Sequence, residues 1–71
     1  MSNLFVKISF YFYEINGITT KMDIEVANNL NAIFEGVERL LFNHNQYLYV
    51  RFYYMGSYYQ IQNKNLIIKQ L

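Results

Sequence analysis

Apolar and polar side chains alternate along the first segment of the chain. In "LFVKISFYFYEI", the even-numbered residues from Leu4 to Phe12 are apolar, whereas Tyr11 and Tyr13 fall on the other side. A period of two places alternate side chains on opposite faces of a β-strand. We therefore predict a strand with one wholly apolar face. Asn16-Gly17, a pair typical of tight hairpin turns, should end it, and "ITTKM" should return as a short second strand.

The period changes at Asp23. From there, apolar residues recur at steps of three and four: Val26, Ala27, Leu30, Ile33, Phe34, Val37, Leu40 and Leu41. This spacing predicts an amphipathic helix over about residues 23–42, with Asp23 as its N-cap and "NHN" at its end. Gly36 inside the helix is interpreted as a point of close packing on a sheet, with a functional kink as the alternative. His44 is interpreted as a cap at the negative end of the helix rather than as a catalytic base.

Period two returns in "YLYVRFYY", where Leu48, Val50 and Phe52 alternate with tyrosines and Arg51. Gly56-Ser57 suits a tight turn, "YYQIQ" a following strand, "NKN" a further turn and "LIIKQL" a last strand. The order is then ββ-α-βββ. It predicts a single α+β domain over residues 1–71, with a mostly antiparallel sheet of four or five strands packed on one helix.

One helix covers only one face of such a sheet, so the other face should be open. If Leu48, Val50 and Phe52 face the helix, the alternate residues face away. The candidate partner-binding residues on that open face are Tyr11, Tyr13, Tyr47, Tyr49, Arg51 and Tyr53.

Three interpretations of these tyrosines are open. Tyrosine is a strong strand former, and the rings could serve the sheet alone. Tyr and Arg are also enriched in the cores and hot spots of protein interfaces. Exposed sheet aromatics can, thirdly, stack the bases of single-stranded nucleic acid. We expect a protein interface, with nucleic-acid binding as the alternative.

The composition argues against most kinds of catalytic or metal-binding site. The chain has 71 residues, no cysteine and one histidine, so neither a disulfide nor a zinc site is expected. No nucleophile elbow, phosphate-binding glycine loop or paired carboxylates in a cleft can be recognised. We predict no catalytic residues, no metal, no cofactor and no enzymatic activity. Because so short a chain has a thin stability margin, we also expect a homodimer.

Charge and hydropathy bear on partners and location. The net charge of +1 argues against a strongly basic nucleic-acid binder. No apolar run is long enough to span a membrane, and "MSNLFVKISF" lacks the features of a signal peptide. We therefore expect a protein of the bacterial cytoplasm, without membrane contact. The abundance of Asn, Ile, Lys, Tyr and Phe favours an A/T-rich genome of a bacterium or phage.

In size, composition and layout, the whole chain resembles the small proteins that phages make to block a host enzyme or a CRISPR effector. The resemblance rests on no motif and assigns no residue. It implies a phage or mobile-element protein that binds and inhibits a larger bacterial protein, such as a replication factor or a nuclease.

Overall fold

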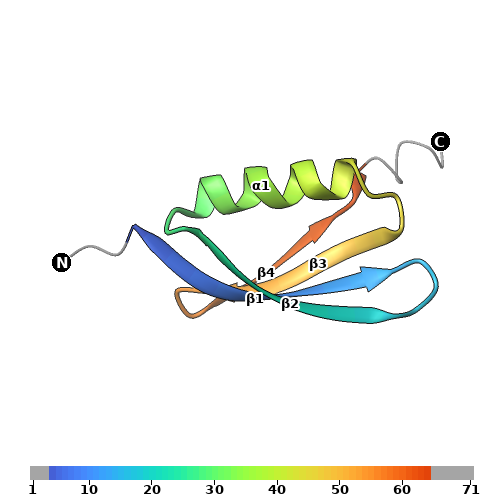
Figure 1. Cartoon of the computed structure of the whole chain (residues 1–71), viewed down its shortest axis with the longest axis horizontal. Coiled ribbons are helices and arrows are strands. Elements are labelled where there is room, and N and C mark those ends of the chain that lie inside the picture. Colours follow the sequence, from blue (N-terminus) through green and yellow to red (C-terminus); the bar gives the residue numbers. More distant parts are fainter. Residues whose placement is uncertain (1–3, 65–71) are drawn as a thin grey trace.

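The computed structural model describes residues 4–64 as one antiparallel sheet covered on one face by a helix (Figure 1). The elements are β1 (Phe5–Glu14), β2 (Thr19–Ala27), α1 (Leu30–Phe42), β3 (Tyr47–Tyr54) and β4 (Ser57–Gln62). The strand order in the sheet is β2-β1-β3-β4. The predicted α+β class, with an antiparallel sheet under a single helix, is confirmed. The predicted last strand, "LIIKQL", lies outside the described residues.

The boundary between the second strand and the helix differs from the prediction. Asp23 lies within β2, which pairs with β1 over its whole length up to Ala27. Val26 fits the period of two that Met22 and Ile24 begin as well as the helical steps that follow it, and pairing with the long strand β1 decides between the two patterns. The helix begins only after Asn29, whose Oδ1 accepts a hydrogen bond of 3.0 Å from the Ala32 N–H.

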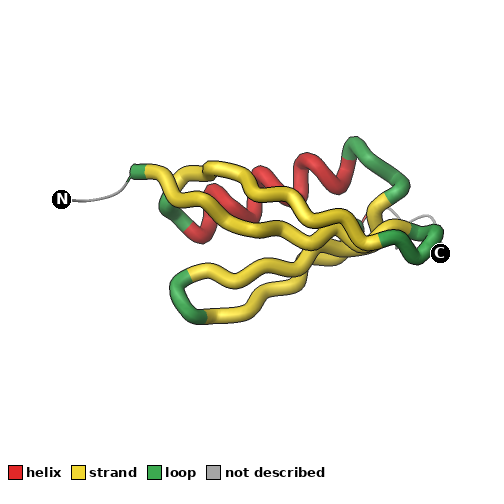
Figure 2. Tube along the Cα trace, turned by 60° about the horizontal axis from the view of Figure 1, so that its bottom comes forward, coloured by secondary structure: helices red, strands yellow, loops and turns green. Residues whose placement is uncertain are grey.

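Two hairpins build the sheet, and their turns lie at opposite ends of it (Figure 2). In the first turn, the Gly17 N–H donates to the Glu14 carbonyl at 3.0 Å, and Gly17 has a φ of +88°. In the second, Tyr54 pairs with Ser57, so the two turn residues are Met55 and Gly56. The predicted Gly56-Ser57 turn is thus wrong by one residue. Met55 and Gly56 both have positive φ, at 51° and 78°, as a type I′ turn requires.

The core lies between α1 and the helix-facing side of the sheet. From the helix, Ile33, Val37 and Leu41 are buried. The buried residues of the sheet are Ile8, Phe10, Phe12, Val50, Phe52 and Ile61. Phe10 and Phe52 pack with ring centroids 5.1 Å apart. The alternation therefore predicted the buried face of β1 from Ile8 to Phe12, whereas Leu4, which precedes the strand, is 74% exposed.

Asn63 ties the end of β4 to the loop that follows the helix. Its side chain is only 2% exposed. The amide Nδ2 donates to the carbonyls of Leu41 and Tyr47, both at 2.9 Å, and lies 3.3 Å from that of His44. Residue 63, predicted only as part of a turn, is therefore a buried hydrogen-bonding centre.

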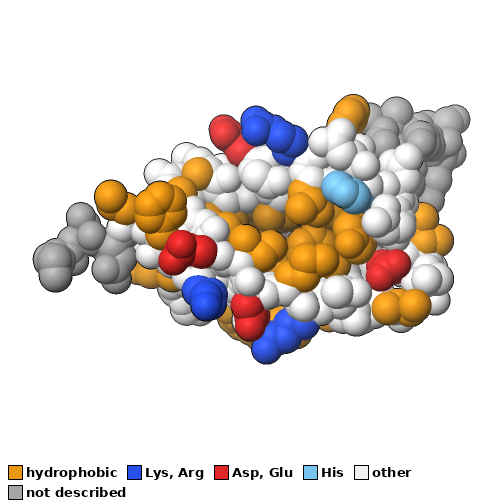
Figure 3. Space-filling view, viewed as in Figure 1, with side chains coloured by type: hydrophobic (Ala, Val, Ile, Leu, Met, Phe, Trp, Pro, Cys, Tyr) orange, Lys and Arg blue, Asp and Glu red, His pale blue; other side chains and the backbone are white. Residues whose placement is uncertain are grey.

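The two layers do not close completely between α1 and the β1–β2 hairpin. An apolar hollow of about 300 Å³ remains there, visible as the recessed group of apolar side chains between helix and sheet (Figure 3). Ile24 and Val26 line it from β2, and Ile33 and Gly36 from α1. A Cβ atom added at Gly36 would meet no atom within 4 Å. The predicted close packing of Gly36 on the sheet is therefore wrong.

Candidate binding surface

The open face of the sheet carries a cluster of tyrosines around one arginine. Strand register brings these residues together: Tyr11 lies opposite Arg51, Tyr13 opposite Tyr49, and Arg51 opposite Gln60 on β4. We call this cluster the aromatic face. It consists of Tyr11, Tyr13, Tyr49, Arg51, Tyr53 and Tyr58. Five of the six candidate residues from the sequence are therefore on one surface.

The centre of the aromatic face is a stack of two rings and a guanidinium. The rings of Tyr13 and Tyr49 are nearly parallel, with centroids 4.5 Å apart and an interplanar angle of 24°. The Arg51 Cζ atom lies 5.0 Å from the centroid of each ring. Its Nε–H donates to the Gln60 Oε1 at 3.0 Å. All three side chains of the stack are half-buried by one another and by their neighbours, so contacts within the protein itself hold this group together.

The surroundings of Arg51 act on the pKa of its guanidinium. Desolvation lowers the pKa of the guanidinium, but neighbouring phenols, with Tyr49 first among them, together raise it by more, and the net shift is upward. Arg51 is cationic in any case, because a guanidinium is not deprotonated in proteins. A planar cation held against aromatic rings combines a large apolar contact area with donors for a carboxylate or a backbone oxygen.

A second aromatic pair extends the surface toward the β3–β4 turn. Tyr53 and Tyr58 lie opposite each other with ring centroids 5.0 Å apart. They are 65% and 48% exposed, more than any other ring of the aromatic face. The prediction missed Tyr58. Continuing the alternation across a turn at Met55 and Gly56 would have found it, because Tyr53 and Tyr58 then occupy opposite positions.

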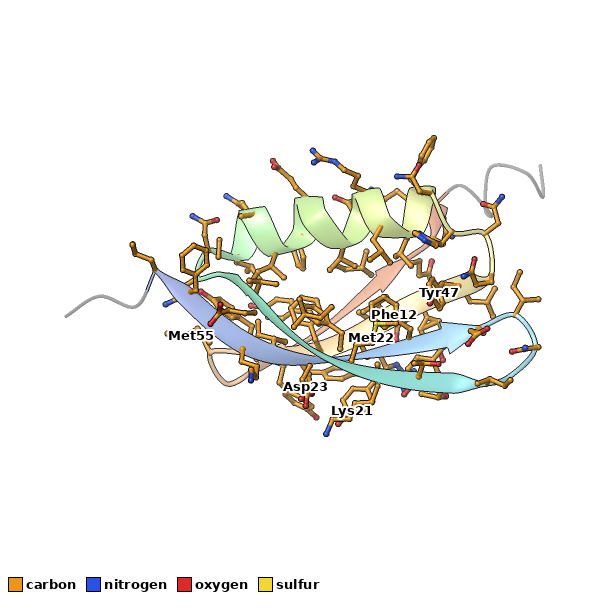
Figure 4. All side chains as sticks on the ribbon, in the orientation of Figure 1. Phe12, Lys21, Met22, Asp23, Tyr47 and Met55 are labelled. Atoms are coloured by element: carbon orange, nitrogen blue, oxygen red, sulfur yellow. The ribbon has the colours of Figure 1, made fainter. Side chains whose placement is uncertain are left out.

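Tyr47 does not belong to this surface, contrary to the prediction. The β1–β3 register shifts between Tyr13 and Glu14, so Glu14 lies opposite Tyr47 and Leu48 is an extra residue in β3. Such a bulge reverses the faces of the residues beyond it. Tyr47 accordingly points between helix and sheet, with its ring centroid 5.0 Å from that of Phe12 (Figure 4). Leu48, expected against the helix, is 39% exposed.

The described part of the chain offers little support for other kinds of functional site. Residues 4–64 hold no group of three or more His, Cys, Asp or Glu side chains placed to bind a metal ion. The His44 Nδ1 lies 2.8 Å from the Leu40 carbonyl, so its Nδ1–H donates to the last turn of the helix, as a cap does. Within residues 4–64, no helix has the length and apolar character needed to cross a membrane.

Comparisons of the chain with protein families, with curated proteins and with solved structures found no match.

Proposed function

We propose that this protein is a non-enzymatic binding module and that the aromatic face contacts a larger bacterial protein and inhibits it. The observation that carries the proposal is the ordered stack of Tyr13, Tyr49 and Arg51 at the centre of the open face. Interface hot spots are rich in Tyr and Arg, because these side chains give large contact areas at a low entropic cost.

The aromatic face is also larger than strand formation alone requires. Two cross-strand tyrosine pairs and a shared arginine lie side by side on strands β1, β3 and β4. Tyr53 and Tyr58 expose about half of their surface or more to water, which a partner would remove. The inhibitory role and the phage or mobile-element origin rest on the resemblance in size, composition and layout. We also propose a location in the cytoplasm of a bacterial host, as expected from the hydropathy of the sequence.

Single-stranded nucleic acid is a weaker candidate for this surface. Stacking of bases is usually combined with a basic groove that follows the phosphates. On the open face, the cations Lys7, Lys21 and Arg51 are nearly balanced by Asp23 and Glu25. The rings at the centre already stack on each other and on Arg51, so fewer ring faces remain for bases.

Affinity capture tests the proposal. The immobilised protein should retain a defined protein from nuclease-treated lysate of a bacterial host, and Tyr49→Ala should release it. Binding should change little with salt, because apolar contacts of tyrosine dominate. Retention of single-stranded DNA with a steep salt dependence, and of no protein, would instead establish the nucleic-acid alternative.

A further inference from the structure

The outer edge of β2 has no strand partner among residues 4–64, because β2 is the first strand in the sheet order. At one end of the β1–β2 hairpin, the Asn28 N–H donates to the Leu4 carbonyl; at the other, the Glu14 N–H donates to the Ile18 carbonyl. Hydrogen-bonded and non-hydrogen-bonded pairs alternate along an antiparallel ladder, so the backbone groups of the even-numbered residues of β2 are hydrogen-bonded to β1. The N–H and C=O groups of Lys21, Asp23 and Glu25 point outward from the sheet.

This edge is long and regular. β2 spans nine residues, contains no proline, and keeps an unbroken register with β1. Natural proteins usually shorten, bend or cover such an edge, because it is a template for a further strand. The apolar hollow beside α1 adjoins it, and Met22, Ile24 and Val26 on its helix side are only half-buried.

The side of β2 that faces away from the helix carries an unusual charge pattern. Lys21 and Asp23 both point away from α1 (Figure 4). The Lys21 Nζ lies 4.0 Å from the Asp23 Oδ1, at the limit of an ion pair, and both side chains are about half exposed. The Ser9 hydroxyl donates to the same oxygen at 2.6 Å and holds the carboxylate in place.

We propose that β2 pairs antiparallel with β2 of a second copy of this chain, with Met22 opposite Met22 at the two-fold axis. In this register, Lys21 of each copy lies opposite Asp23 of the other, so two cross-strand ion pairs form by symmetry. The outward backbone groups of Lys21 and Asp23 form the central hydrogen bonds. On the helix side, Met22 and Ile24 gain apolar neighbours at the open side of the hollow.

Charge selects this register over its neighbours. Centring the pair on Lys21 would oppose Lys21 to itself, and centring it on Ile24 would oppose Asp23 to Glu25 of the other copy. Centring it on Asp23 would pair Lys21 with Glu25 of the other copy but would oppose Asp23 to itself at the two-fold axis. Each of these registers places like charges directly opposite each other, which destabilises an antiparallel pair. Among these registers, only the one centred on Met22 opposes charged residues in attractive pairs alone, and this self-complementarity favours a second copy over an unrelated strand. The inference is independent of the role proposed for the aromatic face.

Sedimentation equilibrium of the full chain with charge-reversal variants tests the pairing. The wild type should sediment at twice its mass of 8.6 kDa at micromolar concentration. Lys21→Glu alone and Asp23→Lys alone should each weaken the dimer about tenfold or more, because both attractive pairs become repulsive. An equimolar mixture of the two variants should recover a dimer, since every opposed pair in the mixed species is again opposite in charge.

Circular dichroism checks that each variant is folded. Arg51→Ala, which removes the centre of the aromatic face, should dimerise like the wild type, so this inference and the proposed function fail separately. A wild-type monomer at high micromolar concentration would overturn the pairing. So would a dimer that survives both single reversals, or a mixture that fails to associate.

Discussion

Met55 occupies the first position of the β3–β4 turn and has a φ of +51°. A positive φ is unfavourable for a residue such as methionine, whose side chain cannot form a hydrogen bond with the local backbone. It is 80% exposed and contributes little packing that a substitution would remove. Met55→Asn, which creates the pair most favoured in a type I′ turn, should stabilise the protein by about 1 kcal/mol. Urea denaturation measures the change. Met55→Ile, β-branched at the same φ, should destabilise it, and equal stabilities would contradict the assigned turn.

Gly36 and Gly17 give opposite predictions for the same substitution. Neither has an atom within 4 Å of an added Cβ, but Gly17 has a φ of +88° whereas Gly36 lies in the middle of α1. Gly36→Ala should therefore stabilise by about 1 kcal/mol through helix propensity. Gly17→Ala should destabilise by about 1 kcal/mol, because alanine disfavours positive φ. Thermal melting of both variants checks this pair, and a loss of stability in Gly36→Ala would mean that the hollow is filled.

The side-chain amide of Asn63 connects the C-terminal end of α1 to the start of β3. Asn63→Asp keeps the shape but removes both N–H donors and places a carboxylate beside the carbonyls of Leu41 and Tyr47. We expect a loss of about 3 kcal/mol or more, because a buried carboxylate would then face backbone carbonyls that now accept from the amide. Asn43→Asp is a matched control on an exposed amide, which donates only to the Arg39 carbonyl, and it should cost far less. Similar chemical-denaturation midpoints for the two variants would argue against the buried role of Asn63.

At the scale of elements, period two predicted β1 and β3, and with them most of the aromatic face. This pattern failed where an irregularity of the backbone changes which alternate residues face the helix. The bulge at Leu48 depends on how β1 and β3 pair, so no local pattern around Tyr47 reveals it. The β2–α1 boundary failed for a related reason. Residues from Asp23 to Ala27 satisfy two periodicities, and long-range pairing with β1 chooses the strand.

At the scale of the whole molecule, the helix α1 and the four-stranded sheet leave two surfaces uncovered among the described residues 4–64. The aromatic face lies on strands β1, β3 and β4, and the free edge lies on β2, at the border of the sheet. Pairing of two β2 edges would keep both aromatic faces on the same open side of one continuous sheet. A dimer could then present two copies of the binding surface to its target, which would raise the apparent affinity without any new contact.

Arg51 offers the most direct test of the central claim, that the aromatic face is a binding surface. Titration calorimetry of the captured partner should compare the wild type with Arg51→Ala and with Arg39→Ala, which makes the same change on the exposed side of α1. The account predicts that Arg51→Ala weakens binding by about 2 kcal/mol, or roughly 30-fold, at nearly unchanged stability, whereas Arg39→Ala binds like the wild type. Equal affinities of Arg51→Ala and the wild type would contradict it.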